Sequence, residues 1–328
     1  MEIGLDIGGA NLKYVSIDKG KVYCRQEYFP IWKKRELNRV LSRFNFDGNV
    51  AVTMSAESSD IFENRKDGVS KILDVLEKIV KDALILTNKP EFITIDEARK
   101  KPLSVASANW IAAPWLLTEF ADRFIYVDVG STTTDVVSVK ERKILFSGMG
   151  DMERAIAGSL IYIGALRTNL ATIKKYLSVD GKTIRVSSEY FATMGDVNIV
   201  LSKIKEEEYT SETPDGRDKD VLNALKRIAR VFHTDFNMVE RRQIEDIARQ
   251  IYSEAIDEIV NAITKNSSGI KTGVYTGSGW FMAKEALKLS KIESDSFETI
   301  IKKNTGLRIK EKNVAQAFSI AYRMRECG

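Results

Sequence analysis

The chain repeats one pattern of strands and turns, and this repeat limits its fold more than any other feature. The first copy, GLDIGGANLKYVSI, covers residues 4–17, and the second, YVDVGSTTTDVVSV, covers residues 126–139. Asp6 and Gly8 correspond to Asp128 and Gly130, a constant offset of 122 residues. In each copy an apolar strand ends in a glycine-containing turn, a second strand follows, and a third comes after a charged turn. The repeat is too long for a solenoid unit, so it predicts two related α/β domains.

The rest of the chain alternates between strand and helix patterns. We expect a first domain at 1–122 and a second at 123–328, with an inserted segment at about 178–235. In the first domain, spacing predicts helices at 33–44, 69–83 and 109–121, a strand at 49–55 and extended chain at 84–95. In the second it predicts helices at 158–176, 280–289 and 314–324 and a strand at 272–276.

Composition excludes several classes of protein. The 328 residues carry a net charge of +4 from 50 basic and 46 acidic side chains, so a broad basic surface for nucleic acid is not expected. No apolar run approaches the roughly 20 residues of a membrane span. The N-terminal residues run directly into a strand without a basic segment, so we expect no signal peptide and a cytoplasmic location.

Each of the two turns has the residues of a phosphate-binding loop. Glycine at a strand reversal lets backbone amides approach an anion closely, and successive N–H groups form an anion-binding nest. In the first loop the candidate binding residues are Gly8, Gly9, Asn11 and Lys13. In the second loop they are Gly130, Ser131, Thr132 and Thr133, and Thr134 adds a further hydroxyl. A solvated strand end explains Lys13 equally well.

An aspartate precedes each turn, Asp6 in the first copy and Asp128 in the second. A carboxylate beside a phosphate is unfavourable unless a cation separates them, and Mg²⁺ is typically held by one or two carboxylates together with substrate phosphates and water. A plain glycine turn explains one copy alone, but two copies at a constant offset favour a metal-bound polyphosphate. We therefore expect catalytic Mg²⁺ at Asp6 and Asp128.

A third motif, VYTGSGWFMAKEAL, covers residues 274–287. An apolar strand ends there, and Gly277, Ser278 and Gly279 lead into a helix whose N-terminus favours an anionic ligand. Trp280 follows at once. Its ring either narrows an adenine pocket, stacks on an aromatic substrate or belongs to the core. Taken alone, the motif has low specificity.

Taken in order, the two loops and the TGSG turn resemble the superfamily of acetate and sugar kinases, heat-shock chaperones and actin. The resemblance spans nearly the whole chain. It includes a connecting helix at 158–170 and the closing helix NVAQAFSIAYRM. It implies two RNase H-like domains, each with a mixed five-stranded sheet flanked by helices, and a cleft between them.

A narrower resemblance lies in GSLIYIGALRTNL, residues 158–170, which is similar to hydantoinase/oxoprolinase-like archaeal proteins, and SSEYFATMGDVNIVL and TPDGRD extend it. This set looks like proteins of the tetrahydromethanopterin-linked one-carbon pathway of methanogens. One member class joins 5-(aminomethyl)-3-furanmethanol diphosphate to the phenol of γ-glutamyltyramine in methanofuran biosynthesis and releases pyrophosphate. The resemblance implies a Mg²⁺-assisted transferase with these two small-molecule partners, and homodimers are common among small members of the superfamily.

A base would assist the attack of a phenol, whose reference pKa is near ~10. Our candidate is Asp135, at the mouth of the second loop; the alternative is that it hydrogen-bonds the threonines of that loop. Arg167 is expected to clamp an anion through its guanidinium, unless a carboxylate of the fold is its partner. His233 is the only histidine and lies in an apolar run, where a packing role is the more common one.

Two alternatives stay open. A small-molecule kinase, of the pantothenate-kinase type, would use the same aspartates for Mg²⁺ and place adenosine over Gly277–Gly279, and ATP is expected only in this case. A nucleotide-switched structural protein is the other alternative. The chain has no counterpart of the large extra domains that filament-forming and chaperone members carry.

Overall fold

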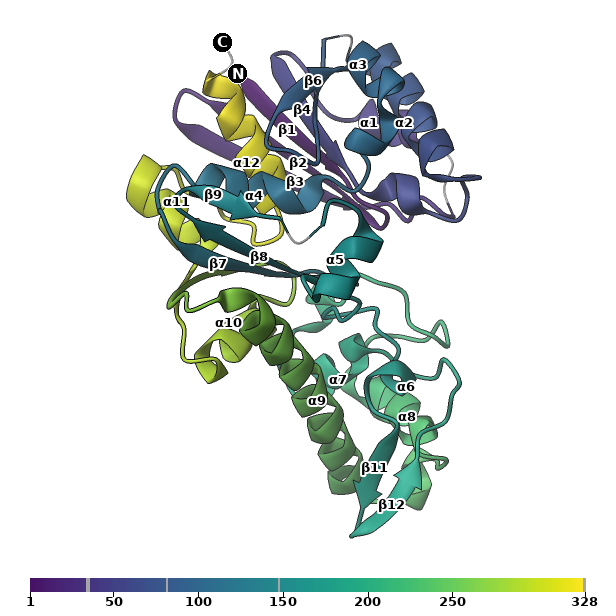
Figure 1. Cartoon of the computed structure of the whole chain (residues 1–328). Helices are drawn as coiled ribbons and strands as arrows, with labels where there is room; N and C mark the ends of the chain where they lie inside the picture. The colour runs from purple at the N-terminus through teal and green to yellow at the C-terminus, as the bar shows by residue number, and fades with distance from the viewer. Residues whose placement is uncertain (34–35, 81, 147, 327–328) are drawn as a thin grey trace. The chain divides into compact units, whose positions relative to one another are not determined.

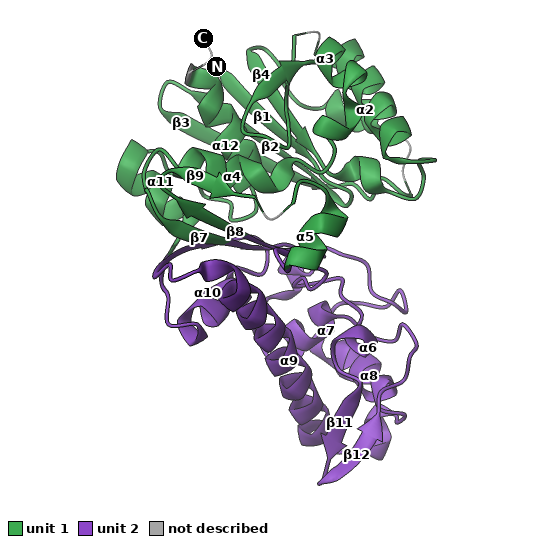
Figure 2. Ribbon diagram, viewed as in Figure 1, with its two compact units in different colours: residues 1–126, 137–157, 295–328 green, residues 127–136, 158–294 purple. Residues whose placement is uncertain are grey.

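The computed structural model describes residues 1–33, 36–80, 82–146 and 148–326. It consists of two compact units. Unit 1 contains residues 1–126, 137–157 and 295–328, and unit 2 contains residues 127–136 and 158–294 (Figure 2). The predicted boundary at residue 122 separates two duplicated domains. The division into compact units does not test that boundary, so it stays a prediction.

Unit 1 is built on a six-stranded mixed sheet of order β3-β2-β1-β4-β5-β6 (Figure 1). The strands are β1 (Glu2–Ile7), β2 (Asn11–Asp18), β3 (Lys21–Tyr28), β4 (Asn49–Met54), β5 (Leu84–Leu86) and β6 (Phe92–Thr94). β2 is antiparallel to β1 and β3, whereas β1, β4 and β5 are parallel to one another. This order, with an antiparallel second strand, confirms the RNase H-like expectation. β6 adds an antiparallel edge strand to the expected five.

Local sequence explains the meander. Lys19 and Gly20 both have positive φ, 46° and 78°, between the paired residues Asp18 and Lys21. Positive φ at both central residues is the geometry of a tight hairpin turn that matches the twist of the strands. β1 is buried from Ile3 to Ile7, as expected of a central strand that is covered on both faces.

Unit 1 has seven described helices. They are α1 (Leu37–Leu41), α2 (Arg65–Ile79), α3 (Ile95–Lys100), α4 (Asn109–Leu117), α5 (Asp151–Ala157), α11 (Phe297–Thr305) and α12 (Ala315–Arg323). Short 3₁₀ turns, η1 (Ala56–Ser58), η2 (Pro102–Ser104) and η5 (Met324–Glu326), connect or end some of them. α1 is shorter than its predicted range, of which residues 34–35 lie outside the described part.

One glycine sets the distance between β1 and α12. α12 packs on β1, β2, β4 and α4. A Cβ on Gly4 would overlap the carbonyl oxygen of Ala317 and would lie 3.0 Å from the backbone nitrogen of Ala321. The helix backbone therefore lies directly on the strand backbone, an approach that only glycine permits.

The second sheet has the order β10-β8-β7-β13-β14, and β9 also pairs with β8. Its strands are β7 (Phe124–Val129), β8 (Thr134–Lys140), β9 (Lys143–Leu145), β10 (Leu160–Ile161), β13 (Thr272–Thr276) and β14 (Glu293–Ser296). With β9 as the third strand, the order again reads 3-2-1-4-5. The repeated meander of the sequence thus corresponds to a repeated sheet topology.

The helices of unit 2 are α6 (Leu170–Ile173), α7 (Met194–Val200), α8 (Val221–Val231), α9 (Arg241–Ser267) and α10 (Trp280–Leu289). β13 and α10 lie at their predicted bounds. In the part of the chain that the structure describes, no helix is both long and apolar enough to cross a membrane.

The inserted segment is folded. It contains α7, α8, most of a hairpin of β11 (Tyr176–Val179) with β12 (Lys182–Arg185), and the 3₁₀ turn η3 (Glu206–Glu208). The 3₁₀ turn η4 (Phe236–Met238) follows the segment. Arg227, 1% exposed, donates from Nε to Asp196, 0% exposed, over 2.8 Å, and from Nη1 to Asp215 over 3.1 Å. Asp215 therefore ties the charged loop to α8. His233 is exposed, so the packing role expected from its apolar surroundings in the sequence is wrong. Its Nε2 lies 2.9 Å from the carbonyl oxygen of Arg185.

The predicted helix at 158–176 is wrong. The segment instead forms β10, an irregular stretch and the single turn α6. Gly158 has φ +73°. The amides of Ala165 and Leu166 donate to the carbonyl oxygens of Gly130 and Ser131 over 2.9 and 3.1 Å. Because these amides bond to the second loop, they do not form the i→i−4 bonds of a helix.

We predict that Gly4→Ala lowers the free energy of unfolding by about 1–3 kcal/mol, because the methyl group forces α12 away from β1. Gly150→Ala is the matched control: a Cβ there meets nothing within 4 Å, and a change within about 0.5 kcal/mol is expected. Urea unfolding of both variants measures the difference. Equal midpoints would contradict the direct contact between the two backbones.

Candidate functional site

The first loop, in unit 1, is closed by a bond from the amide of Gly8 to the carbonyl oxygen of Asn11 over 3.0 Å. A Cβ on Gly8 would lie 2.9 Å from that same oxygen, whereas one on Gly9 would meet nothing within 4 Å. The Asn11 side chain accepts from Gln26 over 3.3 Å. Gly8 is thus required by the turn, and Gly9 leaves open space beside the backbone, as an approaching anion requires.

Asp6, at the end of β1, is 1% exposed. Lys13 donates from Nζ to Asp6 Oδ2 over 3.0 Å. Asp6 Oδ1 has no hydrogen-bond partner among the described residues, and the same holds for the hydroxyl of Thr53, which lies opposite Asp6 in the β1–β4 register. Two buried oxygens without partners at one strand end call for a water, an ion or a ligand.

The second loop, in unit 2, repeats this turn: the amide of Gly130 donates to the carbonyl oxygen of Thr133 over 2.8 Å. The pair Gly8–Asn11 thus has its counterpart 122 residues later. Thr134 is fully buried, and its hydroxyl donates to the carbonyl oxygen of Ile163 over 2.6 Å. Its role is structural. The side chains of Ser131, Thr132 and Thr133 are partly exposed and stay available as donors.

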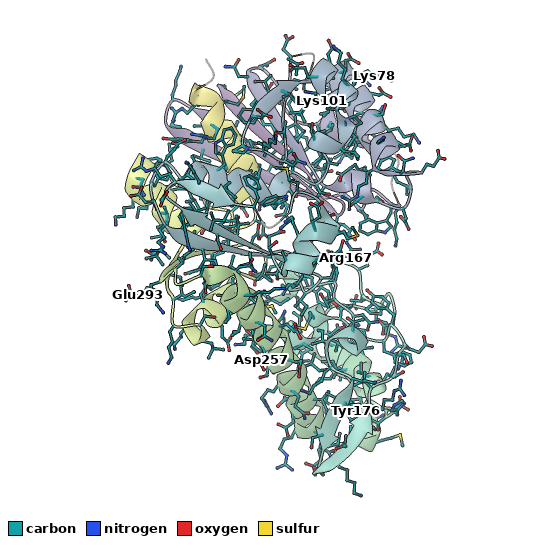
Figure 3. The ribbon with its side chains drawn as sticks, viewed as in Figure 1. Lys78, Lys101, Arg167, Tyr176, Asp257 and Glu293 are labelled. Carbon is teal, nitrogen blue, oxygen red and sulfur yellow. The ribbon has the colours of Figure 1, made fainter. Side chains whose placement is uncertain are left out.

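The segment after β10 packs on the second loop. A Cβ on Gly164 would overlap the backbone nitrogen of Thr132. Arg167, labelled in Figure 3, donates from its backbone to the carbonyl oxygen of Ser131 over 2.8 Å and from Nη1 to the hydroxyl of Thr132 over 3.3 Å. This fixes the guanidinium of Arg167 beside the loop hydroxyls.

The TGSG turn also lies beside the second loop in unit 2. Gly277 has φ +95°, and a Cβ on it would overlap Asp128 Oδ1 and the carbonyl oxygen of Val129. The amide of Gly279 donates to that carbonyl over 2.7 Å. Trp280, partly exposed, stacks on Tyr275 with ring centroids 6.4 Å apart. The glycines are therefore needed to bring the start of α10 against Asp128, which is 7% exposed.

Asp135 lies at the start of β8, where its backbone pairs with Leu160 of β10. Its side chain is partly exposed. No observation on the described residues decides its role, so the assignment of Asp135 as the base stays a prediction.

Sequence reasoning missed one group of polar residues in unit 1. Glu57 in η1 is 1% exposed and accepts from the hydroxyl of Ser107 over 2.8 Å. Burial raises the pKa of the Glu57 carboxyl above its usual range, although the hydrogen bond from Ser107 opposes the shift. The only signal in the sequence is a glutamate among small residues directly after a strand, in TMSAESS.

The residues present fit a magnesium ion held mainly by its substrate. Among the described residues no group of three or more His, Cys, Asp or Glu side chains is arranged to hold a metal ion. Mg²⁺, however, commonly uses one or two carboxylates plus substrate phosphates. Asp6, with its unpartnered Oδ1, would supply one such ligand in unit 1, and Asp128 would be the corresponding carboxylate beside the second loop. Both assignments stay predictions.

Comparison with known proteins identifies the family. The hydantoinase/oxoprolinase family model matches residues 49–301. The chain belongs to this family. It is 37% identical over 294 residues to a (4-{4-[2-(gamma-L-glutamylamino)ethyl]phenoxymethyl}furan-2-yl)methanamine synthase of Methanocaldococcus jannaschii, and the match covers 88% of each chain. A protein of the same name from Methanococcus vannielii is 39% identical over 165 residues, 50% of this chain and 74% of that protein.

Solved structures show a distant likeness. The activator of the 2-hydroxyisocaproyl-CoA dehydratase from Clostridium difficile, with bound ADPNP, matches with a TM-score of 0.48 at 10% identity and covers 100% of this chain and 97% of its own. A likeness at this level carries no functional conclusion. The narrower relationship to the family therefore rests on sequence.

We predict that Gly277→Ala weakens the binding of magnesium pyrophosphate at least about tenfold, a cost of roughly 1.4 kcal/mol, because the methyl group collides with Asp128. Gly181→Ala is the matched control, since Gly181 also has a positive φ, +77°, but a Cβ there meets nothing within 4 Å. Titration calorimetry measures both affinities. Binding to Gly277→Ala as tight as to Gly181→Ala would contradict the placement of the turn at the anion site.

Proposed function

We propose that this enzyme joins 5-(aminomethyl)-3-furanmethanol diphosphate to the phenol of γ-glutamyltyramine and releases pyrophosphate, a step of methanofuran biosynthesis. The observation that carries the proposal is the 37% identity over 88% of the chain to a synthase whose name describes an aryl ether between these two halves. A transferase of this type forms one carbon–oxygen bond and breaks another. It transfers no phosphoryl group.

In this reaction the enzyme mainly has to stabilise the leaving diphosphate. The phenol oxygen bonds to the furylmethyl carbon, the bond from that carbon to the bridging oxygen breaks, and its electron pair leaves with the diphosphate. The furan ring spreads positive charge that develops on the carbon. Charge therefore accumulates on the diphosphate, and groups preorganised around it lower the barrier.

The two loops supply such groups. In the proposal, the backbone amide of Gly9 and the hydroxyls of Ser131, Thr132 and Thr133 hydrogen-bond the diphosphate. Gly8 and Gly130, whose amides close the two turns, shape the loops around it. Lys13 and Arg167 add positive charge, each held at its loop by the contact described above. Mg²⁺ held by Asp6 and Asp128 would neutralise the charge of the departing diphosphate.

The turn at Gly277, Ser278 and Gly279 and the ring of Trp280 are proposed to border the substrate beside the second loop. Asp135 is retained as a candidate base for the phenol proton. The cytoplasmic location and a homodimer likewise stay proposals. Neither the kinase nor the structural protein is favoured by a particular observation on the described residues.

The direct test supplies both proposed substrates with Mg²⁺ and follows pyrophosphate together with the mass of the aryl ether. We expect both products in equal amounts. A parallel reaction with ATP and a panel of small alcohols, pantothenate included, reports on the kinase alternative. ADP with a phosphorylated alcohol, and no ether in the first reaction, would reject the transferase.

We predict that Asp6→Asn and Asp128→Asn each lower ether formation at least about a hundredfold with the fold intact, because the charge that holds Mg²⁺ is lost. Asp18→Asn, at an exposed strand end, is the control and should keep wild-type activity. Rates at limiting Mg²⁺ and thermal unfolding midpoints are the measurements. Full activity of both site variants would contradict the metal assignment.

A further inference from the structure

Four polar side chains from four separate segments of unit 1 form one connected group, which we call the Glu57 cluster: Glu57 in η1, Arg65 at the start of α2, Ser107 before α4 and Asp151 at the start of α5. The hydroxyl of Ser107 is its centre. It lies 2.8 Å from Glu57 Oε1, 3.4 Å from Asp151 Oδ2 and 3.4 Å from Arg65 Nη1. Arg65 Nη2 donates to Asp151 Oδ2 over 2.5 Å.

The cluster is buried at one end and open at the other. Glu57 is 1% exposed and Ser107 is 6% exposed, whereas the side chains of Asp151 and Arg65 are 20% and 38% exposed. A chain of hydrogen bonds therefore runs from partly solvated groups through one hydroxyl to a buried carboxyl. Such a chain is suited to moving a proton inward.

The buried end is incompletely satisfied. Glu57 Oε2 has no hydrogen-bond partner among the described residues, and neither has the indole Nε1 of Trp110, three residues after Ser107 and 4% exposed. Leaving such groups unpaired in a protein interior is unfavourable, so their retention requires an explanation. A carboxylate with a single hydrogen bond also holds a proton more readily than a fully bonded one.

The backbone around Glu57 is specialised. Gly68 of α2 brings its helix against η1: a Cβ there would lie 2.5 Å from the carbonyl oxygen and 2.8 Å from the Cα of Glu57. Ser107 has φ +49°, a strained conformation for a non-glycine residue, and such conformations concentrate at functional sites. Both features hold the carboxyl and the hydroxyl in one geometry.

The cluster also adjoins the first loop within unit 1. The amide of Ser55 donates to the carbonyl oxygen of Ile7 over 3.0 Å, and η1 begins at the next residue. Because β1 and β4 are parallel, the loop after β1 and the turn after β4 lie at the same edge of the sheet. Ligands of open α/β sheets bind at this edge.

We propose that the Glu57 cluster receives the proton of the acceptor phenol, with Ser107 in contact with the phenol and Glu57 as the final acceptor. This inference rests on the proposed function. The phenol gives its proton to Ser107 Oγ as its oxygen attacks the furylmethyl carbon, and the hydroxyl proton of Ser107 moves to Glu57 Oε1. The electron pair of the broken carbon–oxygen bond leaves with the diphosphate. One carbon–oxygen bond is thus formed and one is broken, and the phenol proton ends on Glu57.

Charged neighbours tune this acceptor. Burial is the main cause that raises the pKa of Glu57; the hydrogen bond from Ser107 and the charge of Arg65 oppose it, and the charge of Asp151 adds to it. A carboxyl whose pKa is raised toward neutrality accepts a proton more effectively than an ordinary glutamate. Asp135 remains the competing candidate for the same role.

The test compares wild type, Glu57→Gln, Ser107→Ala and Asp135→Asn with two acceptors, γ-glutamyltyramine and its ring-tetrafluorinated analogue. The fluorinated phenol is already ionised at pH 7 and needs no base. We expect Glu57→Gln and Ser107→Ala to lose about 10²–10⁴-fold in ether formation with the ordinary phenol. With the fluorinated phenol the loss should shrink to less than tenfold. Asp135→Asn should show no such dependence on the acceptor.

The outcomes separate the relay from the proposed function. Ether formation by wild type with an unchanged rate in Glu57→Gln, or a loss of equal size with both phenols, rejects the relay and leaves the transferase intact. If only Asp135→Asn loses more ether formation with the ordinary phenol than with the fluorinated one, the base is Asp135 instead. No ether from wild type with either phenol rejects the proposed function and the relay with it.

Stability gives a readout independent of activity. Because the folded pKa of Glu57 lies above its unfolded value, the native state binds more protons, and stability falls as pH rises from about 4.3 to the folded pKa. We predict that in Glu57→Gln the free energy of unfolding no longer shows this decrease with rising pH. Urea unfolding midpoints between pH 4 and 8 measure it. Glu97→Gln is the control, since hydrogen bonds from Thr94 lower the pKa of Glu97. A pH profile of Glu57→Gln that matches wild type would contradict the raised pKa.

Discussion

The first strand of each main sheet carries a buried carboxylate near its end, Asp6 in β1 and Asp128 in β7, and the surrounding structure has to compensate its charge. Removing a carboxylate from water is costly unless opposite charge or hydrogen bonds compensate. At Asp6 part of the compensation is Lys13, and one oxygen still lacks a partner among the described residues. At Asp128 the carboxylate oxygen Oδ1 lies so close to the backbone of Gly277 that a Cβ there would overlap it. The proposed Mg²⁺ would supply the remaining opposite charge, so metal binding and the stability of this strand end are linked.

Glycine makes these approaches possible, and it does so at a few places with distinct roles. Gly4 lets α12 lie on β1, Gly68 lets α2 lie on η1, and Gly277 lets the start of α10 meet Asp128. In each case the absent Cβ permits backbone to approach backbone or carboxylate. The elements around the loops are thereby fixed by backbone contacts, which change less readily than side-chain contacts. This suits a site whose task is to present preorganised donors.

The sequence predicted the regular elements well and the irregular ones poorly. β13 and α10 were predicted at their observed bounds because apolar spacing and the glycines between them mark both ends. The helix at 158–176 was wrong because the amides of Ala165 and Leu166 bond to the second loop, a tertiary effect that periodicity does not report. The repeat pointed to the two loops and Asp6 as a candidate site, and this assignment stays a prediction. Glu57 and Ser107 were missed because their significance lies in burial, a positive φ and partners far away in sequence.

In the proposed reaction the diphosphate leaves from carbon, with its bridging oxygen. The most direct measurement uses the furanmethanol diphosphate donor with oxygen-18 in the bridge between carbon and phosphorus, together with γ-glutamyltyramine. We expect all of the label in pyrophosphate and none in the ether, whose oxygen comes from the phenol. Label retained in the furan product, or a phosphorylated acceptor, would show cleavage at phosphorus and reject the proposed reaction.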